Sequence, residues 1–323
     1  MIKYIKQMKI NKQKYITLNS SQVNAGVIAE YKRELLKLVQ KMIYGYTKEI
    51  LELFKDNKTE LKQMRYATDT DISDDIKKKM DMLNDVYTRY FAQNSKSPAQ
   101  NMVNKTAIIV KTNWTKEYAK FMFLVLQNAE KHPEDKVFNE FIKNNFAPMN
   151  FMRTPAGKKA FAQSFALNTS AYSEVAEQIK QMTINNNVEL IKSIHQQYHR
   201  EISQALYNSI INGKSIKTIK EALLEAGVKT KRRAGLIAQD QCNKINSALQ
   251  MQELKEIGVK KVKWIHVGGG KTDRKTHITP APKGLNGAIF DINKGIYDPA
   301  VQKNIKPAEL PFCRCQAVAV MEI

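Results

Sequence analysis

The chain has 323 residues, of which 43% are hydrophobic, and this length exceeds that of one typical domain. Two folded units with real hydrophobic cores are therefore the first expectation. The 52 Lys and Arg residues outnumber the 31 Asp and Glu residues and give a net charge of +21. This charge favours polyanionic partners such as nucleic acid, although an AT-rich genome produces the same Lys-, Asn- and Ile-rich composition without selection for binding.

The sequence excludes several classes of protein. The basic amino-terminal segment has no apolar stretch followed by a small-residue cleavage site, so no secretory signal is expected. The longest unbroken apolar runs, such as Phe121–Leu126, are far too short to span a membrane. Three cysteines provide no disulfide framework. These features predict a soluble protein that is synthesised in the cytoplasm.

The amino-terminal part of the chain shows apolar side chains at three- and four-residue steps, which is the period of an amphipathic helix. Helices are predicted over residues 22–55, 71–96 and 100–130. An irregular passage follows at residues 134–169, where six phenylalanines predict either a packed connector or a docking surface. We place the main domain boundary at this passage, with a helical region at 1–170 and a second domain at 171–323.

The second domain is predicted to begin with helices and to end in strands. Helices are expected over 173–212, 216–226 and 231–257, each ended by a glycine that can take a left-handed cap. Alternating apolar residues then predict strands over 262–266, 288–292 and 313–320. Every element before this β-containing module, residues 259–323, reads as helix. The fold class is therefore α+β, with a mostly helical region followed by a small α+β domain.

Two nucleotide-binding motifs are absent from the glycine-rich stretch. Gly270-Lys271-Thr272 would end a phosphate-binding loop only if a glycine stood at position 265, which is Ile265. A dinucleotide fingerprint fails as well, because Asp273 stands where the third glycine is required.

His277 and the pair Cys313-x-Cys315 form the main candidate site, because imidazole and thiolate are the ligands that zinc prefers. His266 or Asp273 would supply a fourth ligand. The C-x-C spacing differs from the C-x-x-C of zinc knuckles, and a strand would place both sulfurs on one buried face as small apolar groups. A hydrolytic metal centre and a Cys–His nucleophile are further alternatives. No cofactor is expected unless this cluster holds a structural zinc.

The remaining histidines and cysteine carry weaker signals. His195 and His199 are spaced four residues apart on a predicted helix but lack the glutamate of an H-E-x-x-H motif, so they are predicted to be a surface pair. Cys242, in the middle of a predicted helix, is predicted to be a core residue.

The carboxy-terminal third is about twice as densely basic as the rest of the chain. A group of basic residues near the predicted first strand is therefore the candidate for contact with DNA phosphates, although a solvated face would look the same. Its members are Lys260, Lys261, Lys263, Lys271, Arg274 and Lys275.

Two stretches in the predicted helices of the second domain carry a family resemblance, Asn187-Val188-Glu189-Leu190-Ile191 and Ile237-Ala238-Gln239-Asp240-Gln241. They are similar to the entry helix and to the helix written I-A-R-D-Q of the phage head morphogenesis, or MuF-like, family of minor head proteins, which the second domain resembles. Gln239 replaces the arginine of that pattern, and residues 134–169 have no counterpart in it. The motif positions of the family that match in the β-containing module are Trp264, Arg274, His277, Gly287, Cys313 and Cys315.

The resemblance implies a low-copy component of the phage head that acts in head morphogenesis and procapsid assembly. It implies a virion location inside the capsid near the portal vertex, with portal protein, scaffold or major capsid protein and double-stranded DNA as partners, and no membrane. In some relatives the protein is ejected with the DNA, so a role in DNA packaging or ejection is also implied. The chain ends just past the C-x-C motif, without the toxin or enzyme extension of some relatives, so no enzyme is expected.

The sequence and the resemblance are therefore compatible with two functions. The first is a structural protein whose amino-terminal helices dock on portal or scaffold and whose basic module contacts DNA nonspecifically. The second is a metal-dependent, nuclease-like hydrolase that uses the His277, Cys313 and Cys315 cluster.

Overall fold

The computed structural model describes residues 8–10, 13–18, 22–54, 70–131, 172–211, 216–268 and 273–322. The chain forms two compact units, and each draws on separate parts of the sequence. Unit 1 comprises residues 1–24, 104–180 and 242–323, and unit 2 comprises residues 25–103 and 181–241. The predicted aromatic connector at 134–169 and the domain boundary beside it fall outside the described residues, so the boundary stays a prediction.

The described elements confirm the predicted α+β class. The helices are α1 (Ala25–Leu53), α2 (Thr70–Asn94), α3 (Lys96–Lys131), α7 (Glu174–Ile211), α8 (Ile216–Glu256) and α9 (Lys275–Ile278). The strands are β1 (Met8–Ile10), β2 (Gln13–Leu18), β3 (Lys261–Ile265), β4 (Ile289–Asp291), β5 (Ile296–Asp298), β6 (Lys303–Ile305) and β7 (Gln316–Glu322). None of the described helices combines the length and the apolar character needed to cross a bilayer.

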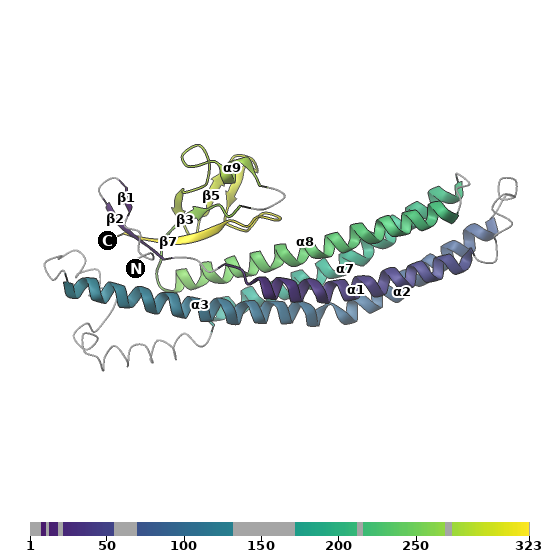
Figure 1. Ribbon diagram of the computed structural model, residues 1–323, viewed down its shortest axis with the longest axis horizontal. Coiled ribbons are helices and arrows are strands. Elements are labelled where there is room, and N and C mark those ends of the chain that lie inside the picture. Colours follow the sequence, from purple (N-terminus) through teal and green to yellow (C-terminus); the bar gives the residue numbers. More distant parts are fainter. Residues whose placement is uncertain are drawn as a thin grey trace. The chain divides into compact units, whose positions relative to one another are not determined.

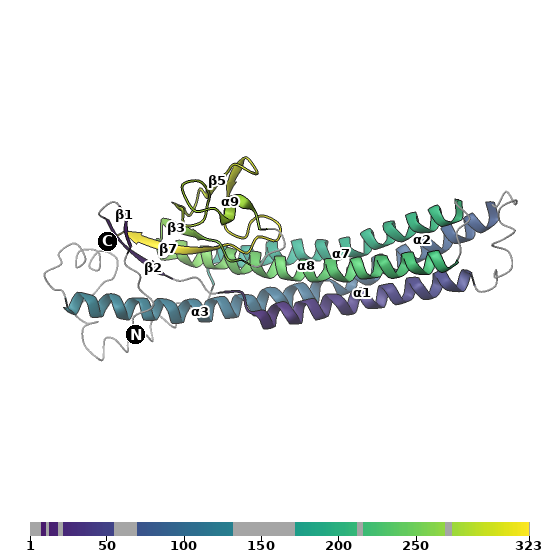
Figure 2. The same ribbon diagram turned by 45° about the horizontal axis from the view of Figure 1, so that its top comes forward.

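Unit 1 is built on an antiparallel sheet with the strand order β1-β2-β7-β3-β4, beside a separate hairpin of β5 and β6. Strand β3 lies between β4 and β7 in this order, and Figure 2 shows β3 beside β7. In the pairing of β3 with β7, Trp264 lies opposite Ala317 and Ile265 lies opposite Gln316. The strands predicted at 262–266 and 288–292 are confirmed as β3 and β4, whereas the third begins at Gln316 and not at Cys313.

The sheet extends to the amino terminus of the chain, which the sequence did not predict. Strand β2 pairs with β7, with Tyr15 opposite Glu322 and Leu18 opposite Ala319. The prediction that every element before residue 259 is helical is therefore wrong for residues 8–10 and 13–18. Strand β2 is extended because it pairs with β7, which comes from the other end of the chain. The spacing of apolar residues within a short basic segment cannot predict such a distant partner.

The core of unit 1 lies between the sheet and helices. It contains Trp114 and Tyr118 of α3 and Met251 and Leu254 of α8, together with buried residues of the strands such as Trp264. The largely buried ammonium group of Lys111 in α3 forms an ion pair of 2.8 Å with Glu253 of α8. The helices thus cover one side of the module with apolar and paired charged groups, as burial of charge requires.

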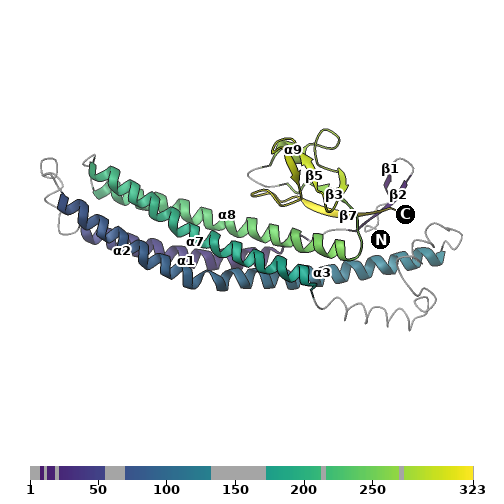
Figure 3. The ribbon, with the colours of Figure 1, turned by 180° about the vertical axis from the view of Figure 1, so that it is seen from behind.

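Unit 2 consists of α1, α2 and the adjoining parts of α3, α7 and α8 (Figures 1 and 3). The helix predicted to end at Gly227 does not end there, because α8 runs without interruption from Ile216 to Glu256. A Cβ atom at Gly227 would lie 3.4 Å from Ile43 Cγ2 of α1. The glycine therefore marks a close approach of two helices and not a cap, and the two predictions of helices 216–226 and 231–257 are corrected to one helix.

A buried aromatic and histidine cluster holds α1 and α7 together in unit 2. The Tyr46 hydroxyl of α1 lies 3.1 Å from His195 Nε2 and 3.0 Å from His199 Nδ1. Tyr87 of α2 and Tyr198 of α7 pack on the Tyr46 ring, with ring centroids 5.3 Å away in both cases. His195 is 1% exposed, so the predicted surface pair is wrong for this residue. The four-residue spacing places His195 and His199 on one face of α7, as predicted, but only the packing of α1 against that face shows that it is internal.

The hydrogen bonds around Tyr46 fit two neutral histidines. Ser203 donates its hydroxyl proton to the His199 carbonyl at 2.8 Å, which leaves Ser203 Oγ to accept the Nε2 proton of His199. His199 Nδ1 then accepts from Tyr46, and Tyr46 accepts the Nε2 proton of His195. Burial, followed by the nearby His199, lowers the pKa of His195 to about 4.

We expect alanine to have opposite effects at the two helical glycines of this unit. Gly227→Ala places its methyl group at ordinary contact distance from Ile43 and should raise the free energy of unfolding by about 0.5–1 kcal/mol. Gly45→Ala overlaps the Tyr87 hydroxyl and should lower it by about 1–3 kcal/mol. Urea unfolding followed by circular dichroism measures both, and destabilisation by Gly227→Ala would contradict the continuous helix.

We expect His195 to make unit 2 less stable in acid. The unfolded chain binds a proton on this imidazole near pH 6.5 and the folded chain only near pH 4, so the free energy of unfolding falls as the pH drops from about 6.5 to about 4. The loss should be roughly 2 kcal/mol, whereas stability above pH 6.5 is unaffected by this group. His195→Gln provides the control, because it lacks the titrating group. Parallel pH profiles for the two proteins would contradict the assignment.

Candidate functional site

The three residues of the predicted metal cluster lie together in unit 1. His277 from α9 meets Cys313 and Cys315 from the segment before β7, and their ligand atoms all lie within 4.8 Å of one another. The exposed fractions of the three residues are 2%, 4% and 3%. The cluster is therefore a closed site inside the core and not a group on the surface.

The pairing of β3 with β7 brings His266 to the same site. Continued by one residue past Ile265 and Gln316, the observed register sets His266 opposite Cys315. His266 Nδ1 lies 3.5 Å from Cys315 Sγ, and its Nε2 lies 3.9 Å from Asp273 Oδ1. Both residues named as a fourth ligand therefore lie beside the cluster, with His266 the nearer to sulfur.

Asp298 is a member of the site that the sequence did not single out. It ends β5, is fully buried, and its Oδ2 lies 3.1 Å from His277 Nε2. Its other oxygen accepts the Ala300 amide at 3.0 Å, which fixes the carboxylate. The Asp298-Pro299 dipeptide signals a turn in the sequence, but nothing in it indicates that His277 is the partner.

The other motif positions hold the site in place. Arg274 donates from Nη2 to the Pro311 carbonyl at 3.1 Å and so joins the start of α9 to the segment that carries both cysteines. Asn286 Oδ1 accepts the His266 amide at 3.1 Å. Gly287 donates its amide to the Trp264 carbonyl at 2.8 Å and has a φ of +84°, a conformation that a side chain would strain. These contacts hold together the segments that carry His266, His277 and the two cysteines.

The surroundings of the two thiols shift their pKa values in opposite directions. The pKa of Cys313 is lowered to about 4, first by its hydrogen bond with Cys315 and then, against burial, by His277 and the Cys315 and Ala308 amides. The pKa of Cys315 is raised by Cys313 and by burial, whereas Trp264 and the Val267 amide act in the opposite direction. Burial tends to lower the pKa of His277, but Cys313 and Asp298 outweigh it and raise that pKa. The site thus stabilises a thiolate beside a histidine.

The residues predicted to contact DNA differ in their surroundings. Lys271 lies outside the described residues, and the guanidinium of Arg274 is bound to Pro311. Lys261 and Lys263 alternate with the buried residues of β3. The four other described members of the predicted group are Lys260, Lys261, Lys263 and Lys275, of which Lys263 is half buried and the rest are exposed.

Together these observations define a helical protein that carries a small α+β module with a histidine and cysteine core. Residues 200–318 match the family described as phage Mu protein F like protein. The predicted resemblance to this family is thereby confirmed over these residues.

The chain was also compared with curated proteins and with solved structures. The chain is 26% identical over 212 residues to an uncharacterized protein of Haemophilus influenzae, which covers 63% of the chain and 44% of the relative. The chain thus spans less than half the length of this curated relative. No solved structure matches the chain.

Proposed function

We propose that the protein is a minor head protein that associates with the portal vertex and acts in phage head morphogenesis, inside the capsid. The observation that supports this function best is the family match over residues 200–318, together with the position of the motif residues Trp264, Cys313 and Cys315 in one core. Trp264, His277 and both cysteines pack there as mutual supports, which is the pattern of a structural element.

A structural role is favoured over hydrolysis. A hydrolytic centre needs an open position for water or substrate, whereas His277, Cys313 and Cys315 are nearly inaccessible to solvent. The metal-dependent hydrolase therefore remains the weaker alternative, and we propose no catalytic residue.

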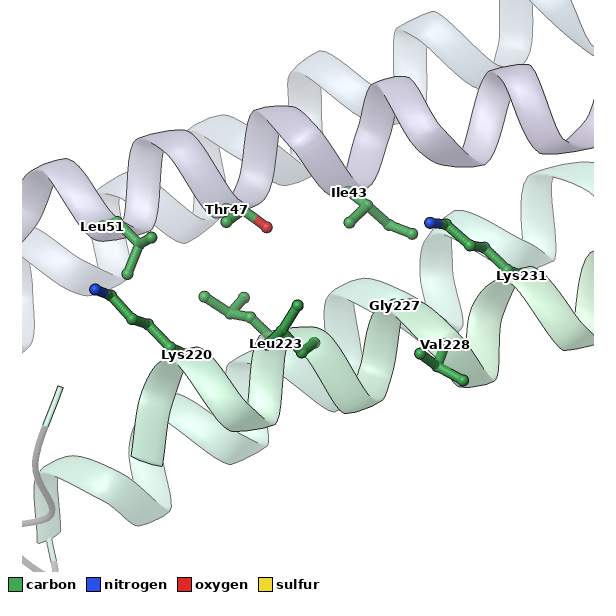
Figure 4. Close-up of a pocket in the computed structure, with 9 residues that line it drawn as sticks. Ile43, Thr47, Leu51, Lys220, Leu223, Gly227, Val228 and Lys231 are labelled. Atoms are coloured by element: carbon green, nitrogen blue, oxygen red, sulfur yellow. The ribbon is translucent and has the colours of Figure 1, made fainter. Parts of the chain in front are cut away.

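The groove between α1 and α8 is our proposed docking site for the portal protein. It has a volume of about 270 Å³ and is lined mainly by apolar side chains, with Lys220 and Lys231 at its two ends (Figure 4). Leu224 and Val228 on its rim are 71% and 67% exposed. Exposed apolar groups between two cations fit an amphipathic helix that carries acidic residues at corresponding positions. The apolar lining comprises Ile43, Leu51, Leu223, Leu224 and Val228.

DNA contact is the second part of the proposal, and the lysines at the first strand of the module would provide it. Lys260, Lys261 and Lys263 follow one another at and before β3, where they can reach consecutive phosphates without reading bases. Contact of this kind suits a protein beside packaged DNA, because it depends on charge and not on sequence.

Changes on the groove should weaken binding to portal protein. The variant Leu224→Asp/Val228→Asp introduces two buried charges at the proposed interface, so its affinity for the portal protein of the same phage should fall at least about tenfold. Ile108→Asp/Met182→Asp is the matched control, since both residues are 65% exposed and lie outside the groove. Equal binding by the two variants in a pull-down of co-expressed proteins would contradict the docking site.

Loss of the lysines should reduce the salt dependence of DNA binding. In Lys260→Gln/Lys261→Gln/Lys263→Gln, each phosphate contact removed should lower the slope of log K against log salt by about 0.9, for DNA of any sequence. Fluorescence anisotropy with a double-stranded probe at several salt concentrations measures the slope.

The control for this experiment carries the same change in charge on unit 2. Lys48, Lys77 and Lys78 belong to α1 and α2, and their replacement by Gln should leave the slope unchanged. An equal decrease in both variants would assign DNA binding to net charge alone and remove the lysines of β3 from the proposal.

A further inference from the structure

We propose that Cys313, Cys315 and His277 bind one Zn²⁺ ion as a structural site, with His266 as the fourth ligand. The site lies between β3, α9, the β5–β6 hairpin and the segment before β7, and it is independent of the proposed role in the phage head. Zinc is the metal of choice, because two thiolates and two imidazoles match its preference for sulfur and nitrogen in a tetrahedron.

The distances between ligand atoms fit a tetrahedral zinc ion. With zinc bonds of about 2.3 Å to sulfur and about 2.05 Å to nitrogen, a sulfur and a nitrogen on one ion lie about 3.6 Å apart. His277 Nδ1 lies 3.6 Å from Cys313 Sγ and 3.7 Å from Cys315 Sγ. His266 Nδ1 lies 3.5 Å from Cys315 Sγ. Three of the six edges of the tetrahedron thus have the lengths that a bound ion would require. His266 is not part of the group whose ligand atoms all lie within 4.8 Å of one another, so its ring must move closer to complete the tetrahedron.

The orientation of His277 also fits a metal ligand. Asp298 accepts a hydrogen bond from His277 Nε2, and in the neutral ring this leaves the lone pair of Nδ1 directed at the two sulfurs. A carboxylate behind a ligating histidine is the usual second layer of a zinc site, where it fixes the ring and raises its basicity. His266 repeats the arrangement, with Nδ1 toward Cys315 and Nε2 toward Asp273.

Donors surround the sulfurs as they do around metal-bound thiolates. The backbone amides of Cys315 and Ala308 face the Cys313 sulfur, and the Val267 amide faces the Cys315 sulfur. The indole N–H of Trp264 is buried and has no hydrogen-bond partner among the described atoms, and the Cys315 sulfur is close to it. A thiolate on zinc would accept these protons, whereas a neutral thiol is a poor acceptor.

The backbone before the cysteines is held in an unusual conformation. Ala308 and Phe312 have φ angles of +64° and +60°, although neither is a glycine. Such conformations are uncommon outside glycine and persist only where the surrounding structure fixes the backbone, as in turns and at binding sites. Here they turn the segment 306–312 so that Cys313 and Cys315 follow with both sulfurs on the side of His277.

The test is the zinc content of the full chain, purified from cells grown with added Zn²⁺ and measured by native mass spectrometry and elemental analysis. We expect one zinc per chain, and none in Cys313→Ser or Cys315→Ser. Cys242→Ala is the matched control, because Cys242 is a buried cysteine of α8 outside the cluster, and it should retain one zinc. A metal-free wild-type protein with both thiols reactive, or with a Cys313–Cys315 disulfide, would overturn the proposal.

A second variant keeps the test decisive if the serine variants do not fold. Asp298→Asn retains all four ligands but weakens the hold on His277, so zinc affinity in a competition with a chelator should fall about 10–100-fold. Asp291→Asn, in the neighbouring strand β4, should bind zinc as the wild type does. Unchanged affinity in Asp298→Asn would remove His277 from the site, since a purely structural hydrogen bond would alter stability and not zinc affinity.

Discussion

The pairing of β3 with β7 is the constraint on which the module of unit 1 depends. This register sets Trp264 against Ala317, and its continuation brings His266 to Cys315. A shift of β7 by one residue would turn Ala317 and Ala319 away from the core, because side chains alternate along a strand, and it would move Cys315 out of register with His266. The sheet register and the histidine and cysteine cluster are therefore two consequences of one arrangement.

The remaining motif residues act on this arrangement from outside the two strands. Arg274 and Pro311 join the loops that carry His277 and Cys313, and Asp298 fixes the ring of His277. Each contact connects segments that are well separated along the chain. Polar contacts of fixed geometry, with a zinc ion as proposed, would add to the stability that the apolar core of this module provides.

Unit 2 shows a different use of buried polar groups. Tyr46, His195 and His199 form hydrogen bonds between α1 and α7, and Tyr31 donates to Asn187 of α7 at 2.9 Å. Such bonds are costly to bury unless every partner is present, so they favour one alignment of the helices over a slipped one. The same unit presents the exposed apolar rim of the proposed docking groove. In α1, the buried hydrogen bonds to α7 and the proposed docking groove thus involve different residues.

The sequence by itself determined the α+β class, the long helices, the strands β3 and β4 and the three residues His277, Cys313 and Cys315. These features depend on local period, residue type and short spacing, which a single segment contains. Tertiary structure alone decided that α8 continues through Gly227, that β2 joins β7, that His195 is internal and that Asp298 stands behind His277. Each of these depends on a partner distant in the chain, and a sequence pattern carries no record of which distant segments meet.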